Sequence, residues 1–418
     1  MHYFTYHLNE LYCEEVPVKE IVNQFGTPIY IYSARTIRRH FSVFSASFKE
    51  VDHLVCYSVK ANSNLAVLAL LGKEGAGADV VSAGELVRAL KAGIPASKIV
   101  YSGVGKRPDE IKLALKAGIL MFNVESLEEL ECLGEIAKGL GIKAPFAVRV
   151  NPNVDPKTHP YISTGLKKNK FGIPEEEVID AYLKAKKNPY LLPIGLDAHI
   201  GSQITEVSPF VSALRRLKAL WNELTRLGFE LKYLDLGGGL GIPYANEEPP
   251  PPEEYARAII EEVKPLDCTL ILEPGRVIVG NAGILVTRVL YRKTNGDKKF
   301  VIVDAGMNDL IRPTLYQAYH KIQPVKLTTS EEEVVDVVGP VCESGDFFAR
   351  DRKLPKLERG DLLAIMSAGA YGFVMSSNYN SRCRPAEVLV DGETFYLVRK
   401  GETIEDLISL EIIPDYLK

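Results

Sequence analysis

The feature that most constrains the fold is a regular alternation of short apolar segments and amphipathic segments between about residues 50 and 275. The eight apolar segments are LVCYSV (54–59), ADVVS (78–82), KIVYSG (98–103), ILMFNV (119–124), PFAVRV (145–150), IGLDAHI (194–200), YLDLGG (233–238) and TLILEP (269–274). Nearly continuous apolar strands are typical of a parallel sheet that is buried on both faces. The intervening segments, such as 83–93 and 126–140, repeat apolar residues at helical spacing. Eight successive β–α units favour an α/β fold with a closed (β/α)8 TIM-type barrel, and an open doubly wound sheet is the alternative.

The pattern changes after about residue 280, where strand-like segments follow one another with few helices between them. These segments are 283–293, 298–306, 333–341, 360–366 and 386–400. Turn residues separate them at short intervals, which predicts a second, mostly β domain. The segment PIYIY (28–32) precedes the barrel pattern and is expected to join this second domain. The predicted domains are therefore 33–280 for the barrel, and 1–32 with 281–418 for the β domain.

Composition excludes several classes of protein. The chain has 418 residues and a formal net charge of −4, so electrostatics give no reason to expect a nucleic acid or a membrane surface as a partner. The N-terminal residues MHYFTYHLNE do not resemble a signal peptide, and no apolar run approaches the roughly 18 residues of a membrane helix. The six cysteines form no CxxC pair, so no metal site is predicted. Reduced thiols in a cytoplasmic protein are expected.

Polar residues and glycines stand where the predicted barrel strands end, which is where β/α barrels build their active sites. They are Lys60, Asp79, Ser82, Arg149, His199, Gly237, Gly238, Gly239, Glu273, Gly275 and Arg276. A desolvated Lys60 would be a usable nucleophile, although a lysine in a salt bridge at the barrel rim is the more common case. His199 could equally be structural. Glu273 ends an apolar strand and should need a cationic partner, either Arg276 or a protonated ring nitrogen of a cofactor.

Three further polar motifs lie in the predicted β domain: RPTLYQAYH (312–320), CESGD (342–346) and SAGAYG (367–372). Arg312 and Tyr316 are four residues apart and would share one face of a helix, with a structural salt bridge as the alternative. Cys342 stands beside Glu343 and could be a reactive thiol, although most cysteines are inert. The glycines 237–239 could let backbone N–H groups approach an anion, but GGGLG does not match the dinucleotide motif GxGxxG.

Taken together, these motifs resemble those of the barrel-fold pyridoxal 5′-phosphate (PLP) decarboxylases, most closely the diaminopimelate decarboxylase family. The ordered motifs are YSVKAN, DVVSAGEL, HIGSQ, GGGLGI, EPGR, RPTLYQAYH, CESGD and GAYG, and they run over nearly the whole chain. The resemblance implies a TIM-type barrel with a Greek-key-like β barrel as the second domain. It also implies decarboxylation of meso-2,6-diaminopimelate to L-lysine and CO2, the last step of lysine biosynthesis.

The resemblance further implies a role for each motif. Lys60 would hold PLP as a Schiff base, Glu273 would keep the ring nitrogen protonated, and His199 would stack on the ring. The implied cofactor-binding residues also include Asp79, Arg149, Ser202, Gly237, Gly238, Gly239, Gly275, Arg276 and Tyr371. The implied substrate-binding residues are Arg276, Arg312, Tyr316, Glu343 and Tyr371. Cys342 would donate a proton and, with Glu343, would reach the site from the other subunit of a homodimer.

Alternatives remain open at this point. A related decarboxylase could act on ornithine, arginine or a carboxylated polyamine, but a buried Arg312 would then be an unpaired charge. A catalytically dead PLP-fold regulator is disfavoured because Lys60, Glu273 and Cys342 are all present. A racemase would need a second base for which no motif is found. Two positions depart from the family pattern: Asp197 stands where a histidine is frequent and Ala83 where a glycine is frequent.

Overall fold

The computed structural model describes residues 2–156, 158–166, 169–328 and 331–418. Two compact units make up the chain: a barrel unit, Arg38–Ile278, and a β unit, Met1–Ile37 with Val279–Lys418. The division between the units falls inside α2 (Ala34–Ser47), the helix that precedes the first barrel strand. Within the described ranges, no helix combines the length and the apolar character needed to cross a membrane.

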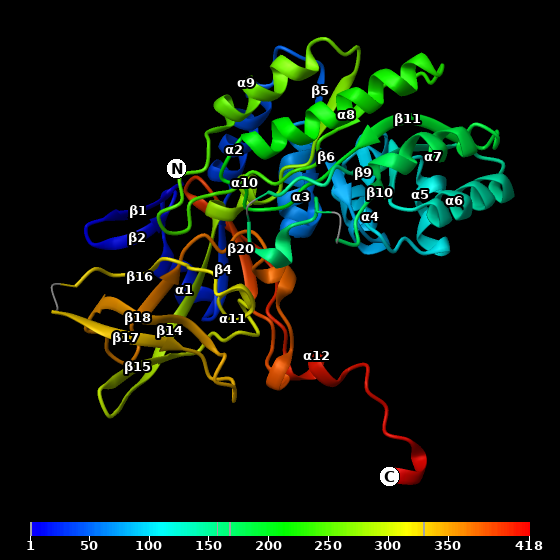
Figure 1. The fold of residues 1–418 in the computed structure, drawn as a ribbon. Helices are drawn as coiled ribbons and strands as arrows, with labels where there is room; N and C mark the ends of the chain where they lie inside the picture. The colour runs from blue at the N-terminus through cyan, green and yellow to red at the C-terminus, as the bar shows by residue number, and fades with distance from the viewer. Residues whose placement is uncertain (1, 157, 167–168, 329–330) are drawn as a thin grey trace. The chain divides into compact units, whose positions relative to one another are not determined.

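Eight parallel strands form the centre of the barrel unit (Figure 1). They are β5 (His53–Ser58), β6 (Gly77–Val80), β7 (Ile99–Tyr101), β8 (Met121–Val124), β9 (Ala144–Asn151), β11 (Leu191–Asp197), β12 (Tyr233–Asp235) and β13 (Thr269–Leu272). Each strand pairs with the next one, and β13 pairs with β5, so the sheet closes on itself. The predicted (β/α)8 barrel is confirmed, and the open doubly wound sheet is excluded.

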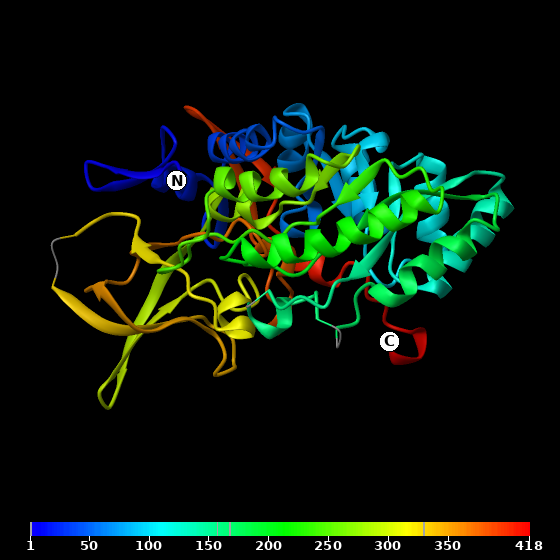
Figure 2. The ribbon, with the colours of Figure 1, turned by 45° about the horizontal axis from the view of Figure 1, so that its top comes forward.

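Helices follow the strands, and all but the last of them, a buried four-residue helix after β13, cover the barrel. They are α3 (Leu65–Lys73), α4 (Ala83–Lys91), α5 (Pro108–Ala117), α6 (Leu127–Leu140), α7 (Val178–Ala185), α8 (Ser208–Arg226), α9 (Pro252–Val263) and α10 (Arg276–Val279). Serine side chains cap the N-termini of two of these helices. In α4, Ser82 accepts a hydrogen bond from the backbone N–H of Glu85, and in α6, Ser126 accepts one from that of Glu129. Figure 2 shows α8 and α9 side by side, in green and yellow-green, on the outside of the barrel.

The barrel interior is filled by side chains from alternate strand positions. One buried layer consists of Cys56, Val100, Met121, Ala147, Ile194 and Ile271. Layers of this kind make the barrel a packed core, and the polar side chains gather towards the carboxyl ends of the strands. The carboxyl ends of the strands therefore present the polar residues that the sequence places there.

The β unit is built from both ends of the chain. Its sheets contain β4 (Ile29–Ser33), β14 (Gly283–Asn295), β15 (Lys298–Val303), β16 (Ile322–Pro324), β17 (Glu332–Val338), β18 (Phe347–Pro355), β19 (Leu362–Ile365), β20 (Ala386–Asp391) and β21 (Thr394–Arg399). The strand β4 runs antiparallel to β14 and parallel to β20. The mostly β character is confirmed. The Greek-key-like barrel stays a prediction, because the strand pairings trace two sheets that share β14.

Smaller elements complete the β unit. A three-stranded sheet at the N-terminus comprises β1 (Phe4–His7), β2 (Glu10–Cys13) and β3 (Val16–Pro17), and α1 (Val18–Phe25) follows it. Two short helices complete the set: α11 (Arg312–Tyr316) lies between β15 and β16, and α12 (Ile404–Ile408) follows the last strand, β21. The core of this unit brings together apolar residues from distant parts of the chain, including Leu11, Ile31, Ile284 and Val388.

Candidate active site

Lys60 lies in a single 3-10 turn (Val59–Ala61) that directly follows β5. Its Nζ is 2.5 Å from Oδ2 of Asp79, which belongs to the neighbouring strand β6. The hydroxyl of Ser58 donates to the same oxygen at 2.5 Å. The Lys60 side chain is 33% exposed and that of Asp79 is fully buried. The structure thus contains a salt bridge at the barrel rim, in which the lysine side chain stays partly exposed.

Glu273 follows β13 and is 4% exposed. Its Oε1 accepts long hydrogen bonds from the hydroxyl of Ser102 at 3.4 Å and from Nδ2 of Asn123 at 3.5 Å. Burial raises the pKa of Glu273 well above its usual value, the charges of Asp235 and Asp79 raise it further, and Lys60 opposes this shift. A carboxyl group of this kind stabilises a cation placed against it.

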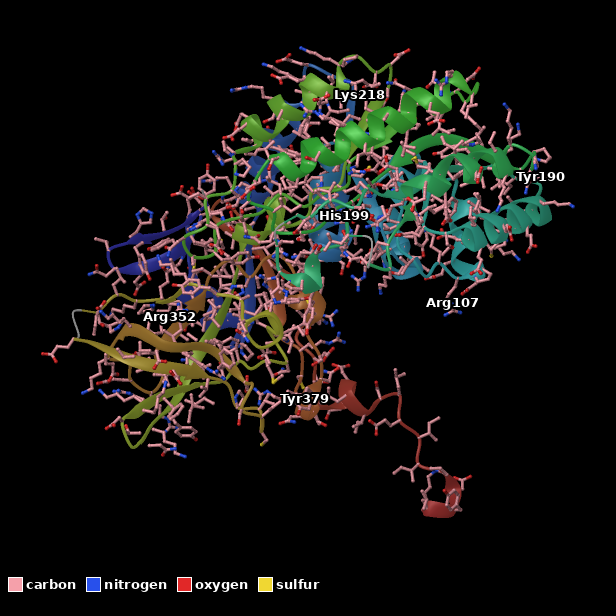
Figure 3. All side chains as sticks on the ribbon, in the orientation of Figure 1. Arg107, Tyr190, His199, Lys218, Arg352 and Tyr379 are labelled. Atoms are coloured by element: carbon pink, nitrogen blue, oxygen red, sulfur yellow. The ribbon has the colours of Figure 1, made fainter. Side chains whose placement is uncertain are left out.

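His199, labelled in Figure 3, follows β11 and contacts the glycine turn after β12. The backbone N–H of Gly238 donates to Nδ1 of His199 at 3.1 Å. Desolvation lowers the pKa of His199 well below its usual value, and the charges of Arg149 and Lys60 lower it further. The imidazole is therefore neutral at physiological pH, which suits contact with a flat aromatic ring.

Arg149 lies near the carboxyl end of β9 (Ala144–Asn151) and is buried in an ion pair. Its Nη1 donates to Oε1 of Glu125 at 2.7 Å, and its guanidinium lies 4.9 Å from the centre of the Phe171 ring. Glu125 also accepts backbone hydrogen bonds from Gly103 at 3.2 Å and from Gly172 at 2.8 Å. Glu125 therefore fixes the position of Arg149 and ties together the loops that surround it.

The glycines after β12 pass through a space with no room for side chains. Gly237 and Gly239 have φ values of +63° and +122°, which favour glycine. A Cβ on Gly238 would lie 2.1 Å from the carbonyl oxygen of Glu273, and one on Gly239 would lie 2.5 Å from that of Gly201. These three glycines, Gly237–Gly239, are called the glycine cradle below. They let the backbone come close to a bound group, as an anion site requires.

Arg276 and Ser202 meet beside this cradle. Nη2 of Arg276 donates to Oγ of Ser202 at 3.0 Å, and Nη1 donates to the hydroxyl of Tyr244 at 2.7 Å. Arg276 is 5% exposed. Gly275 precedes it, and a Cβ there would be 3.0 Å from the Cβ atoms of Ser58 and Ala61. A buried arginine beside a hydroxyl group is well suited to holding an anionic group.

In the β unit, the expected helical face of Arg312 and Tyr316 is confirmed by α11. The Arg312 guanidinium lies 5.7 Å from the centre of the Tyr316 ring, and Nε of Arg312 donates to Nε2 of His320 at 3.3 Å. His320 is fully buried and its Nδ1 lies 2.8 Å from the carbonyl oxygen of Met366. Because Nε2 accepts, Nδ1 carries the proton and donates it to that carbonyl. Arg312 is thus held in place by a buried network.

Cys342 and Glu343 lie on a loop that is fixed by hydrogen bonds to the carboxylate of Asp346. Asp346 accepts backbone hydrogen bonds from Met307 and Val341, each at 2.6 Å. The thiol-bearing residue Cys342 is exposed, and its backbone N–H donates to Oδ1 of Asn380 at 3.1 Å. Glu343 is hydrogen-bonded to the hydroxyl of Tyr379, which Figure 3 labels in this unit, and this bond raises the pKa of Tyr379.

Tyr371 occupies an unusual backbone position in the β unit. Its φ is +55°, in the left-handed region that few non-glycine residues adopt. The next residue, Gly372, is equally constrained, because a Cβ there would lie 2.3 Å from the carbonyl oxygen of Ala368. Backbone strain of this kind persists where the surrounding structure imposes it, and it is often found at functional sites.

The strand ends of the barrel unit therefore gather Lys60, Asp79, Arg149, His199, Ser202, the glycine cradle, Glu273 and Arg276. Sequence reasoning missed Ser102, Asn123, Glu125, Asp235 and Tyr244, which hold the predicted residues in place. A signal for two of them was available, since Asn123 and Asp235 are polar residues inside apolar strands. The remaining predicted residues, Arg312, Tyr316, Cys342, Glu343 and Tyr371, belong to the β unit.

The barrel residues fit PLP, the cofactor that the motifs suggest. An aldehyde needs an amine, which Lys60 offers, and a protonated pyridine nitrogen needs a buried carboxyl group, which Glu273 offers. A phosphate needs converging donors, which the glycine cradle, Ser202 and Arg276 offer. Oδ1 of Asp79 is buried and has no hydrogen-bond partner among the described residues. This oxygen can therefore accept a hydrogen bond from a group bound in the site.

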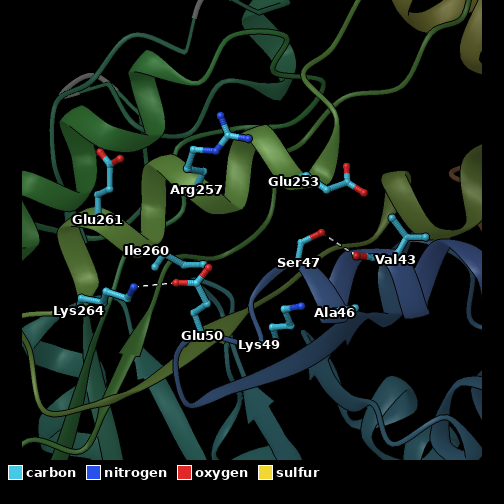
Figure 4. Close-up of a pocket in the computed structure, with 10 residues that line it drawn as sticks. All are labelled: Val43, Ala46, Ser47, Lys49, Glu50, Glu253, Arg257, Ile260, Glu261 and Lys264. Carbon is cyan, nitrogen blue, oxygen red and sulfur yellow. Dashed lines mark hydrogen bonds and ion pairs between the residues drawn. The ribbon is translucent and has the colours of Figure 1, made fainter.

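A separate hollow lies on the outside of the barrel (Figure 4). Its volume is about 550 Å³, and its lining residues come from α2 with the turn that follows it, and from α9 with the residue after it. Glu50 and Lys264 form an ion pair of 2.7 Å within it. None of the predicted site residues lines this hollow, so it is not part of the candidate active site.

Comparison with known proteins agrees with these features. Residues 34–280 match the family model described as pyridoxal-dependent decarboxylase, pyridoxal binding domain. The chain is 53% identical to diaminopimelate decarboxylase of Pseudomonas aeruginosa, over 98% of each sequence. It is also similar to two solved diaminopimelate decarboxylases in complex with L-lysine. The Helicobacter pylori enzyme has a TM-score of 0.91 and 48% identity over 94% of this chain and 98% of that one. The M. jannaschii enzyme has a TM-score of 0.95 and 42% identity over 99% of each chain.

Proposed function

Since the chain belongs to the diaminopimelate decarboxylase family of PLP-dependent decarboxylases, we propose that it converts meso-2,6-diaminopimelate to L-lysine and CO2. This reaction is the last step of lysine biosynthesis. The observation that carries the proposal is the partly exposed Lys60, whose amine is paired with the buried Asp79 on the barrel rim that also bears the buried Glu273. Similarity to two lysine complexes, over nearly the whole chain, supports the choice of substrate.

In this proposal, residues of the barrel unit hold the cofactor. Lys60 would bind it covalently, Glu273 would face the ring nitrogen, and His199 would lie against the ring, with Asp79 and Arg149 beside them. The phosphate would be held by Ser202, Gly237, Gly238, Gly239, Gly275 and Arg276, with Tyr371 nearby. When bound, PLP supplies a conjugated cationic ring that accepts the electron pair left behind by the departing CO2.

The substrate-binding part of the proposal draws on the β unit. Diaminopimelate carries a second amino-acid group at its distal end, with one carboxylate and one ammonium. Arg312 can bind a carboxylate with two parallel hydrogen bonds, and Glu343 can bind an ammonium group. Tyr316, Tyr371 and Arg276 would complete the binding site. In this proposal Arg312, which a buried network holds, is a cation that decarboxylases of ornithine or arginine would not need.

Cys342 is proposed as the acid that protonates the carbon from which CO2 has left. Its exposure on the loop that Asp346 anchors leaves it available to a reacting group outside its own unit. We propose that Cys342 and Glu343 act in the active site of a second subunit, so that the working form is a homodimer. The unpaired cysteines and the biosynthetic reaction are consistent with a protein of the cytoplasm.

An exposed apolar segment supports the proposed dimer. Residues 404–417 expose large apolar side chains, each more than half accessible: Ile404, Ile408, Leu410, Ile412, Ile413, Tyr416 and Leu417. Together they amount to roughly 400–800 Å², counted at about 60–120 Å² for each side chain. Doubled by two-fold symmetry, this area is about what a stable dimer buries.

The test is an assay of the purified protein with added PLP. We expect meso-diaminopimelate to yield L-lysine and CO2, and ornithine, arginine and a carboxylated polyamine to react at least about 100-fold more slowly. Borohydride should trap PLP on the wild-type protein and not on Lys60→Ala. Lys49→Ala, on the outer surface, should behave as wild type. Full turnover by Lys60→Ala would overturn the mechanism. Bound PLP without turnover of any substrate would instead point to a regulator.

A further inference from the structure

Asp235 is a second carboxyl group beside Glu273. It ends β12, the strand next to β13, and it is fully buried. The two carboxyl groups are hydrogen-bonded to each other. Two carboxylates in contact inside a protein cannot both be ionised without a large cost, so such a pair retains a proton. Burial raises the pKa of Asp235 first, and the charge of Asp197 raises it further.

Asn123 links the two groups from β8, on another side of the barrel. Its Nδ2 lies 3.1 Å from Oδ2 of Asp235 and 3.5 Å from Oε1 of Glu273. The same nitrogen lies 3.1 Å from the hydroxyl of Ser102, which donates to Glu273. Asp235 also accepts from the backbone N–H of Gly237 at 2.9 Å. Asp235 thus accepts hydrogen bonds of 2.9 and 3.1 Å, whereas those that Glu273 accepts from Ser102 and Asn123 are 3.4 and 3.5 Å.

Other charged groups surround the pair. Asp79 lies on β6 and Asp197 on β11, and both raise the pKa of Glu273 or Asp235. Lys60, after β5, opposes the shift at Glu273. Arg149, on β9, acts on the neighbouring Asp197 and lowers its pKa. Carboxyl groups outnumber cations here, so the field of the surrounding residues favours keeping a proton on the Asp235–Glu273 pair.

We propose that Asp235 is a positioning residue that shares one proton with Glu273 through the hydrogen bonds that Asn123 completes. This inference rests on the proposed function. With a cation against Glu273, the shared proton resides on Asp235 and Glu273 carries the negative charge. At higher pH this proton leaves, and Asp235 becomes a second carboxylate near the cation. The pair thereby keeps a cation at Glu273 over a wider pH range than one carboxyl group can.

The experiment is a pH titration of the holoenzyme, followed by the absorbance of bound PLP without substrate. In Asp235→Asn the side chain keeps its shape and cannot ionise. We therefore expect the alkaline change in absorbance to occur at least about one pH unit lower than in wild type, as expected when one opposite charge within a few ångströms is lost. Asp309→Asn is the matched control, since Asp309 is a buried aspartate of the β unit, and it should leave the titration unchanged.

A second variant covers the case in which Asp235→Asn does not fold. Asn123→Ala removes the amide that stabilises both carboxylates, so the pair keeps its proton to higher pH and the alkaline change again moves downward. An unchanged titration in both variants, or in the one that folds, overturns the inference. That result is distinct from failure of the proposed function, in which wild-type protein would give no borohydride-trapped PLP at Lys60 and no spectrum to titrate.

Discussion

The amine of Lys60 and Oδ2 of Asp79 lie 2.5 Å apart, at the carboxyl ends of the neighbouring strands β5 and β6. The pairing of Ser58 with Asp79 in the sheet register brings these strand ends to the same level. The hydroxyl of Ser58 donates a hydrogen bond to the same oxygen of Asp79. The position of the amine is therefore set by barrel closure and one buried carboxylate, and it does not depend on a flexible loop.

Gly238→Ala should weaken cofactor binding. The new Cβ would lie 2.1 Å from the carbonyl oxygen of Glu273, so the cradle or the end of β13 must move. Strain of this kind typically costs about 1–3 kcal/mol, which corresponds to at least a several-fold loss of PLP affinity in an absorbance titration. Gly139→Ala, on α6, has nothing within 4 Å of the new atom and should bind PLP as wild type does. Equal affinity in both variants would rule out a steric role for the cradle.

Cys342→Ala should lower kcat by about 10²–10⁴-fold, the usual contribution of a positioned acid. The absorbance of bound PLP and the KM for diaminopimelate should change little, because the residue is assigned only to proton donation. Steady-state kinetics and a spectrum of the holoenzyme measure both properties. Cys383→Ala, in the same unit, is the control. An unchanged kcat in Cys342→Ala would remove the thiol from the reaction.

Arg312→Lys should lower kcat/KM for meso-diaminopimelate by about 100-fold. A lysine cannot form two parallel hydrogen bonds to a carboxylate, and the Nε–H that His320 accepts is lost. The rate with ornithine, which lacks the distal carboxylate, should fall much less. Comparing the two substrates isolates the distal contact, with Arg350→Lys as a control for arginine loss in the same unit. An equal decrease for both substrates would contradict the assignment.

Glu85→Gln should stabilise the protein above neutral pH. Burial raises the pKa of Glu85 to about 7, while the N–H of Val81 and the charge of Lys60 oppose the shift. The folded state then binds more protons than the unfolded state between the usual value of 4.5 and about 7, so stability falls as pH rises through this window. Urea unfolding should show the variant gaining about 1–3 kcal/mol over wild type between pH 4.5 and 8. A difference independent of pH would exclude this cause.

Removing residues 404–418 should dissociate the proposed dimer and abolish activity. A milder variant replaces Leu410 and Ile412 with serine, which removes two of the exposed apolar side chains. The dimer dissociation constant should rise at least about 100-fold, at roughly 1.5 kcal/mol or more for each side chain. Sedimentation over a range of concentrations measures it. Leu8→Ser, at a residue that is 99% exposed, is the control. An unchanged mass in the truncated chain would exclude this segment from the interface.

Most of the barrel could be predicted from sequence, because strands buried on both faces leave continuous apolar runs. Errors occur where a polar segment leaves the sheet: the sixth strand was expected at 194–200, and β11 is Leu191–Asp197. The residues after Asp197 turn into the loop that carries His199. The strand β18 (Phe347–Pro355) was missed, since it lies at the edge of its sheet and carries four charged residues. Edge strands of this composition lack a clear apolar pattern.

The site was predictable to the extent that barrel chemistry gathers at strand ends. That rule found Lys60, Asp79, Arg149, His199 and Glu273 without any structure. It could not find the contacts among them, because Asn123 on β8 meets Asp235 on β12 and Glu273 after β13 only once β13 pairs with β5 and the barrel closes. Contacts between residues so far apart in sequence arise from topology, which no local pattern encodes.

The placement of β4 has a consequence for how the protein is made. This strand leaves the ribosome early, yet its hydrogen-bonding partners β14 and β20 begin at Gly283 and Ala386. At about 5–20 residues per second, β4 waits roughly 20–70 s for its last neighbour. The entire barrel is translated during that interval. A nascent chain that stops before Ala386 leaves one side of β4 without its partner strand β20. An unpaired strand edge of this kind can pair with another chain and promote aggregation.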